Sequence, residues 1–134
     1  NGQRYLEEVP SELQSSLYRF GSMEKSKVQL GFGSDSPVIP MNPLIGIYAA
    51  VTRRTHSGGI LGISESLSAQ DALKAYTLGS ARAVFDEHIR GSIEAGKIAD
   101  LALLDNDPTD CEPEEIKSIS NLMTVCRGMV VWQR

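Results

Sequence analysis

The hydrophobic pattern of this 134-residue chain changes near Gly91. Before this residue, apolar side chains recur mostly at helical spacing, as in the stretches 44–54 and 68–78. After it, short apolar runs alternate with turn residues, which is typical of β-strands. The pattern therefore predicts an α/β arrangement: mainly helical structure up to about residue 90 and a small β unit beyond it.

One short apolar segment interrupts the helical part. Residues 28–32 (Val-Gln-Leu-Gly-Phe) predict a strand, and residues 33–37 (Gly-Ser-Asp-Ser-Pro) follow it directly. Small residues followed by Asp and Pro indicate that the strand leaves the sheet into a loop. We therefore expect Asp35 to lie at the C-terminal end of this strand.

Capping residues and apolar spacing predict three main helices. The first covers residues 11–20, and the second covers residues 44–54 with Asn42 as its N-cap. The third begins after Ser68, and Gly79 is expected to break it before a further helix starts.

The last third of the chain predicts β structure. Residues 91–93 and 99–105 are expected to form two strands around a tight turn at residues 94–97. Residues 122–126 and 129–132 are expected to form a closing hairpin with a glycine turn.

Composition excludes some classes of function. The formal net charge is −4, with 41% hydrophobic and 22% charged residues, which is ordinary for a globular domain and argues against nucleic-acid binding. No apolar run reaches the roughly 18 residues needed to span a bilayer. Cys111 and Cys126 are the only cysteines and predict neither a disulfide scaffold nor a zinc ribbon. We expect a cytoplasmic protein in which Cys126 is buried.

Several segments resemble one family of enzymes. Residues 31–37 resemble the last barrel strand of the metal-dependent amidohydrolases, and residues 67–83 resemble the helices that follow it. Residues 91–101 (Gly-Ser-Ile-Glu-Ala-Gly-Lys-Ile-Ala-Asp-Leu) are the most specific part and resemble the return strand. Residues 123–131 resemble the closing hairpin, and residues 42–54 point to the branch called amidohydrolase family three.

The resemblance implies a (β/α)8 barrel and a β-sandwich built from both ends of the chain. Residues 1–90 would supply the last strand and helices of the barrel, and residues 91–134 would supply C-terminal strands of the small sandwich. Such a barrel needs about 250 residues, so we expect this chain to be a fragment.

The resemblance also implies a function. Its members hydrolyse carbon–nitrogen bonds other than peptide bonds in small-molecule amides, with zinc or a similar divalent metal. Asp35 would be both the catalytic residue and a metal ligand, accepting a proton from water and returning it to the leaving nitrogen. The other ligands of the family have no counterpart here, because His56 and His88 lie downstream of the last barrel strand. We expect no metal and no activity in the isolated fragment. We also expect either association into a homo-oligomer or a rearranged, compact remnant.

The sequence leaves several alternative interpretations open. Taken alone, the local sequence favours a loop aspartate at position 35 that hydrogen-bonds its own turn. Gly33 could serve close approach of a substrate or simply the strand exit. Arg53 and Arg54 are expected to be solvated charges at a helix end rather than an anion site. His56 and His88 are expected to be surface residues rather than ligands. At the level of the whole protein, the alternatives are a non-catalytic amidohydrolase-like protein with an assembly or regulatory role and an independent β-rich interaction module.

Overall fold

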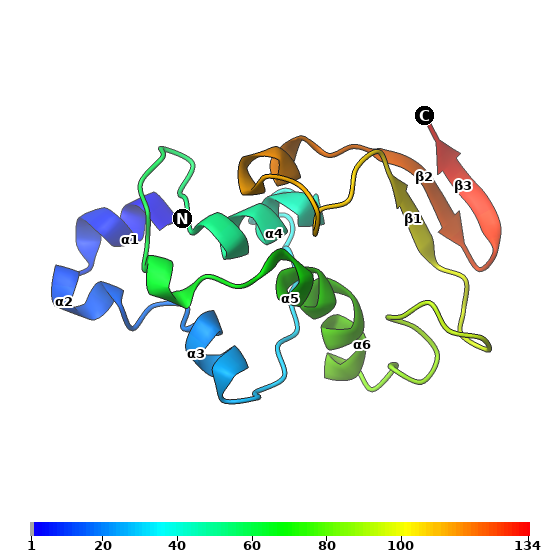
Figure 1. Cartoon of the computed structure of the whole chain (residues 1–134), viewed down its shortest axis with the longest axis horizontal. Coiled ribbons are helices and arrows are strands. Elements are labelled where there is room, and N and C mark those ends of the chain that lie inside the picture. The colour runs from blue at the N-terminus through cyan, green and yellow to red at the C-terminus, as the bar shows by residue number, and fades with distance from the viewer. Residues whose placement is uncertain (1) are drawn as a thin grey trace.

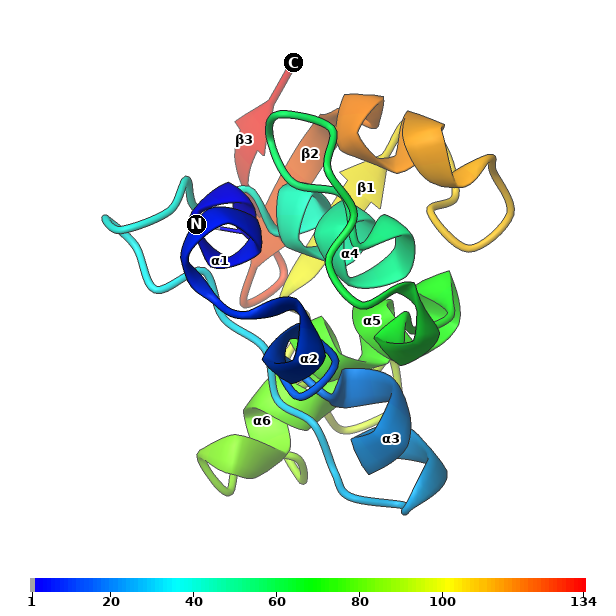
Figure 2. The ribbon, with the colours of Figure 1, turned by 90° about the vertical axis from the view of Figure 1, so that its left-hand side faces the viewer.

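A computed structural model describes residues 2–134. Figure 1 shows an elongated molecule in which the helices gather at one end and a three-stranded sheet lies at the other. Figure 2 shows the helical end, with the N-terminal helices of residues 2–25 nearest the viewer. In chain order the elements are α1 (Gly2–Glu8), α2 (Ser11–Gln14), α3 (Phe20–Lys25), α4 (Pro43–Thr52), the 3₁₀ helix η1 (Ile63–Glu65), α5 (Ala69–Lys74), the π-helical turn η2 (Ala75–Gly79), α6 (Ser80–Ala83), β1 (Leu101–Leu104), the 3₁₀ helix η3 (Pro113–Ser118), β2 (Asn121–Cys126) and β3 (Met129–Gln133).

Helix α4 forms as its capping residues predict. The Asn42 side-chain oxygen accepts a hydrogen bond from the Leu44 N–H at 3.0 Å, and Pro43 occupies the first turn. The helix ends at Arg53, which adopts a left-handed conformation with φ 58°. Its buried face carries Leu44, Ile47 and Ala50.

The hydrophobic core lies where α4 meets α5 and η3. Ile47 and Ile116 are each 1% exposed, and Ala72 is fully buried between them and their neighbours. The buried cluster comprises Leu44, Ile47, Ala50, Leu67, Ala72, Ile116 and Ile119. The loop before β2 therefore contributes to the same core as the helices.

The predicted break at Gly79 is wrong. The helical run continues from α5 through the π-helical turn η2 into α6 without interruption. A Cβ atom at Gly79 would lie 2.0 Å from the carbonyl oxygen of Leu30. Glycine therefore permits close approach of another segment here rather than ending the helix.

Two other local predictions are corrected. The helix predicted for residues 11–20 ends at Gln14, its N-cap is Pro10, and α3 starts only at Phe20. Residues 28–32 form no strand. A strand requires a hydrogen-bonded neighbour, and the only sheet among residues 2–134 pairs β1, β2 and β3.

The predicted C-terminal β structure is largely confirmed. Strand β2 pairs antiparallel with both β1 and β3, with Leu101 opposite Val125 and Cys126 opposite Met129. Gly128 takes φ 78° in the hairpin turn. The strand predicted over residues 91–93 is wrong, although the following turn forms through the Lys97 N–H and the Glu94 carbonyl at 3.2 Å.

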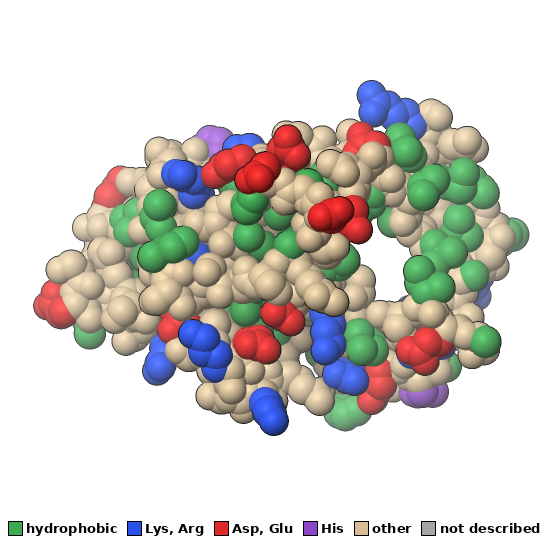
Figure 3. Space-filling model, viewed as in Figure 1, with side chains coloured by type: hydrophobic (Ala, Val, Ile, Leu, Met, Phe, Trp, Pro, Cys, Tyr) green, Lys and Arg blue, Asp and Glu red, His purple; other side chains and the backbone are tan. Residues whose placement is uncertain are grey.

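The sheet exposes apolar side chains. Leu103, Met129, Val131 and Trp132 are between 47% and 67% exposed, and hydrophobic side chains gather over the sheet in Figure 3. Cys126 is also exposed, which contradicts its predicted burial. The fold is thus a mixture of helices and one antiparallel sheet, and none of the helices found between residues 2 and 134 is long and apolar enough to cross a membrane.

Candidate functional site

Asp35 lies in an exposed turn shortly after Phe32. Its backbone is left-handed, with φ 55°, and its carbonyl accepts the Val38 N–H at 2.9 Å. Within residues 2–134, its carboxylate makes no hydrogen bond or ion pair. The side-chain bond within this turn is made by the Ser34 hydroxyl, which accepts the Ser36 N–H at 3.3 Å. The Asp35 carboxylate is therefore available to a ligand.

The backbone before Asp35 is bound to the helix of residues 69–83. The Phe32 N–H donates to the Ala75 carbonyl at 3.0 Å, and the Ser80 hydroxyl donates to the Phe32 carbonyl at 2.6 Å. The Phe32 ring packs between those of Phe20 and Tyr76, with centroids 4.9 Å and 5.5 Å away. Phe32 is thus held by its backbone and by its side chain.

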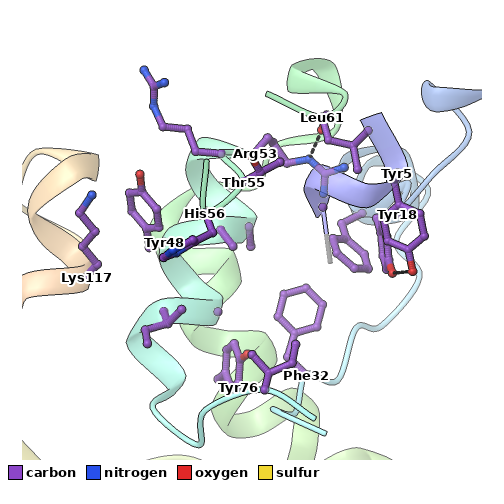
Figure 4. A pocket seen from close by; sticks show the side chains of 18 of the residues that line it. Tyr5, Tyr18, Phe32, Tyr48, Arg53, Thr55, His56, Leu61, Tyr76 and Lys117 are labelled. Atoms are coloured by element: carbon purple, nitrogen blue, oxygen red, sulfur yellow. Dashed lines mark hydrogen bonds between the residues drawn. The ribbon is translucent and has the colours of Figure 1, made fainter. Parts of the chain in front are cut away.

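Gly33 lines a groove of about 1040 Å³ between the N-terminal helices and α4. A Cβ atom at Gly33 would have nothing within 4 Å, so no protein atom occupies the space beside it. Figure 4 shows the aromatic side chains that face this space. The aromatic residues of the wall are Tyr5, Tyr18, Phe20, Phe32, Tyr48 and Tyr76.

Tyr5 and Tyr18 form a hydrogen-bonded pair in the wall of the groove. The Tyr18 hydroxyl donates to the Tyr5 hydroxyl at 3.0 Å, and the two ring centroids are 5.6 Å apart. This hydrogen bond, followed by burial, raises the pKa of Tyr18 above its ordinary value. Burial alone raises the pKa of Tyr76. Both phenols therefore stay protonated at neutral pH.

Arg53 is not the solvated residue that the sequence predicts. It is 7% exposed, and its guanidinium donates to the Leu61 carbonyl at 2.9 Å and the Leu17 carbonyl at 3.3 Å. It also lies 5.8 Å from the centre of the Phe20 ring. Burial lowers the pKa of Arg53, and the negative charge of Glu65 opposes this effect. Arg53 therefore connects the end of α4 to the loops that contain Leu17 and Leu61.

Arg54 and the histidines are surface residues, as predicted. Arg54 is exposed and pairs with Glu114 at 2.8 Å. His56 is exposed in the turn after α4, at the edge of the groove, and His88 is exposed in the turn after α6. Across residues 2–134, no group of three His, Cys, Asp or Glu side chains could hold a metal ion. Asp35 therefore belongs to no such group of three within residues 2–134.

Sequence reasoning missed the aromatic groove and the contact of Ser80 with Phe32. The rings come from separate segments, and no spacing along the chain brings them together. The only signal for the contact with Ser80 was the Gly79-Ser80 pair within a helical pattern.

The sequence of this chain is similar to those of known proteins. Residues 3–132 match the sequence profile described as the amidohydrolase family. The chain is 36% identical over 118 residues to an N-substituted formamide deformylase of Arthrobacter pascens, a match that covers 88% of this chain and 22% of that protein.

Two solved structures have a similar fold. A metal-dependent hydrolase of Pyrococcus horikoshii, described as uncharacterized, is 33% identical with a TM-score of 0.68, over 82% of this chain and 23% of that one. An amidohydrolase of Thermotoga maritima has a TM-score of 0.66 over 94% of this chain and 29% of that one. At 22% identity, this second likeness concerns the fold alone.

The chain spans about a fifth of the length of the curated relatives that it matches. The range of residues 3–132 that matches the family contains Asp35 and the segment 91–101. The resemblance seen in the sequence is therefore confirmed, and the chain belongs to the amidohydrolase family.

Proposed function

We propose that the whole protein hydrolyses a carbon–nitrogen bond other than a peptide bond in a small-molecule amide, and that Asp35 is its acid–base residue. The family match over residues 3–132 carries this proposal. The name of the Arthrobacter pascens relative, an N-substituted formamide deformylase, supports an amide substrate. The non-catalytic alternative is not favoured, because the Arthrobacter pascens relative and the 33% identical Pyrococcus horikoshii structure are both described as enzymes.

The proposed architecture is the end of a (β/α)8 barrel followed by part of a β-sandwich. Residues 1–90 would supply the last strand and helices of the barrel. The segment 28–32 supports this, since Phe32 bonds to the helical run 69–83 through its backbone while no strand among residues 2–134 pairs with the segment. Residues 91–134 would supply the sandwich strands, and the rest of the sandwich would cover the exposed apolar side chains of β1 and β3.

Asp35 is suited to be one ligand of a divalent metal, proposed to be zinc. Its carboxylate is exposed and unpaired within residues 2–134. A hydrolytic zinc site needs about three protein ligands, so the remaining ligands would come from parts of the protein outside this chain. A bound divalent metal supplies a water of lowered pKa and polarises the substrate carbonyl.

The chemical task of Asp35 follows from its carboxylate. As a general base it would accept a proton from the attacking water, and as a general acid it would deliver that proton to the leaving nitrogen. The proposed position at the mouth of a barrel places this carboxylate where the other loops converge. The mobile proton then stays on one residue through both steps.

The test is Asp35→Asn in the full-length protein. We expect turnover of N-substituted formamides to fall by about 10²–10⁴-fold, the usual contribution of a general acid–base residue, with an unchanged melting temperature. Asp110→Asn is the matched control, because Asp110 is exposed and its carboxylate is likewise unbonded within residues 2–134. Near-normal turnover by Asp35→Asn would remove Asp35 from the mechanism.

A further inference from the structure

The geometry points to Ser80 as a positioning residue that sets the location of Asp35 through the backbone of Phe32. This inference rests on the proposed function of Asp35. Ser80 touches no reacting group, and its contact with the candidate site is made entirely through the main chain.

Ala75 and Ser80 both form hydrogen bonds with the backbone of Phe32. The Ser80 hydroxyl lies 2.6 Å from the Phe32 carbonyl and 3.0 Å from the Ala75 carbonyl. A hydroxyl has one proton to donate, and the shorter distance assigns it to Phe32. The Ala75 carbonyl accepts the Phe32 N–H, also at 3.0 Å. Both polar groups of the Phe32 backbone are therefore satisfied by the helix.

The π-helical turn makes this arrangement possible. In η2 the Ser80 N–H bonds to the Thr77 carbonyl, while the Ala75 carbonyl faces Phe32. Gly79 lets the segment approach, since a Cβ atom there would lie 2.0 Å from the Leu30 carbonyl oxygen. Such π-helical turns occur frequently at functional sites.

Among the residues just before Asp35, Phe32 is the one whose backbone is bonded to the helix. Along residues 29–34, all of which the structure describes, it is the one residue whose N–H and carbonyl both bind other protein groups. Gly33 follows with open space around it. The next main-chain bond is that of the Asp35 turn itself, from the Val38 N–H. A shift of Phe32 would therefore be transmitted to the Asp35 carboxylate.

Displacement of the Asp35 carboxylate would slow catalysis. An error of about 1 Å in a reacting group can cost about 10²-fold in rate. Loss of the Ser80 hydroxyl leaves the Phe32 carbonyl without its donor and loosens the attachment of Phe32 to the helix. We expect an effect on turnover rather than on substrate binding.

The experiment compares four variants of the full-length protein. Ser80→Ala removes the donor, Ser80→Cys keeps a similar volume with a weak donor, and Ser80→Thr keeps the hydroxyl. Thr77→Ala is the matched control, because the Thr77 hydroxyl donates to the Leu73 carbonyl at 2.9 Å one turn earlier and does not reach Phe32.

We expect Ser80→Ala and Ser80→Cys to lower kcat by about 10–100-fold with KM changed less than about 3-fold. Ser80→Thr should stay within about 3-fold of the natural protein, and Thr77→Ala should match it. Hydrogen exchange followed by mass spectrometry should show faster exchange in the peptide that contains Phe32 for the Ala and Cys variants only. A melting temperature for each variant shows that it is folded.

The results separate this inference from the proposed function. If Asp35→Asn loses turnover while Ser80→Ala and Ser80→Cys keep normal kcat, the inference is wrong and the proposed function stands. If Asp35→Asn keeps its turnover, the acid–base role proposed for Asp35 fails, and the role of Ser80 fails with it. If Ser80→Ala does not fold, the comparison of Ser80→Cys with Ser80→Thr tests the inference in its place. Equal kcat values in these two variants would overturn the inference.

Discussion

The carboxylate of Glu65 accepts two hydrogen bonds from Ser22, one from its backbone N–H at 2.7 Å and one from its hydroxyl at 2.5 Å. Glu65 is 7% exposed, although it is charged. The contact joins α3 to η1 and lies beside Gly21, where a Cβ atom would come within 3.1 Å of the Glu65 backbone. These two hydrogen bonds, the side-chain one foremost, lower the pKa of Glu65 below its ordinary value.

The lowered pKa predicts an acid-dependent loss of stability. The folded-state pKa lies below the unfolded-state value of about 4.3, so the contribution is present above that pH and is lost as the pH falls through the folded-state pKa. We expect Ser22→Ala to destabilise the chain at pH 7 and to differ less from the natural chain at acidic pH. Urea unfolding across this range measures the difference. Ser26→Ala, at the exposed C-cap position of the same helix, is the control, and an equal effect of Ser22→Ala at all pH values would contradict the prediction.

Gly79→Ala should destabilise the fold. An alanine inside a helix is normally favourable by about 1 kcal/mol relative to glycine. Here the added Cβ would lie 2.0 Å from the Leu30 carbonyl oxygen, which belongs to the backbone. Overpacking of this kind costs about 1–3 kcal/mol, and the free energy of unfolding measures it.

Gly33→Ala is the matched control for Gly79→Ala. A Cβ atom at Gly33 meets nothing within 4 Å, so the free energy of unfolding should stay within about 0.5 kcal/mol of the natural value. If Gly79→Ala were as stable as Gly33→Ala, the close approach of Leu30 to the helix would be refuted.

Asn42→Ala should weaken the start of α4. The substitution removes the acceptor of the 3.0 Å hydrogen bond from the Leu44 N–H. Loss of an N-cap costs about 0.5–2 kcal/mol, measurable by thermal or urea unfolding. Asn42→Asp keeps an acceptor oxygen and should retain most of the stability, so equal losses in both variants would count against the capping role.

The 134-residue chain alone should neither hold stoichiometric zinc nor hydrolyse an amide. Asp35 is one ligand, and no group of three His, Cys, Asp or Glu side chains that could hold a metal lies within residues 2–134, whereas a hydrolytic zinc site needs about three. Metal analysis and an amidase assay beside the full-length protein test this. Turnover by the short chain with one bound zinc would overturn it.

Features that depend on nearby residues could be predicted from the sequence. The caps at Asn42 and Ser68 bond to groups two and three residues away, and the hairpin of β2 and β3 turns at Arg127 and Gly128. The family was also recognisable, because the segment 91–101 keeps a distinctive order of residues.

Features that depend on distant residues could not be predicted. Gly79 looked like a helix breaker, because the approach of Leu30 from nearly 50 positions away is invisible in a local pattern. Arg53 looked like a solvated helix end, but its partners Leu17 and Leu61 lie on either side in the sequence. The segment 28–32 has strand-like composition, and composition does not provide a neighbouring strand.

The sequence by itself determined the family, the caps and the closing hairpin, since each depends on the identity and spacing of a few neighbouring residues. The family resemblance, not the local pattern, singled out Asp35 as the candidate catalytic residue. The tertiary structure alone decided what holds Phe32, three residues before Asp35. The Phe32 backbone is bound by Ala75 and Ser80, which lie more than 40 residues further along the chain. Hydrogen bonds act only over about 3 Å in space, so partners this far apart in sequence are chosen by folding.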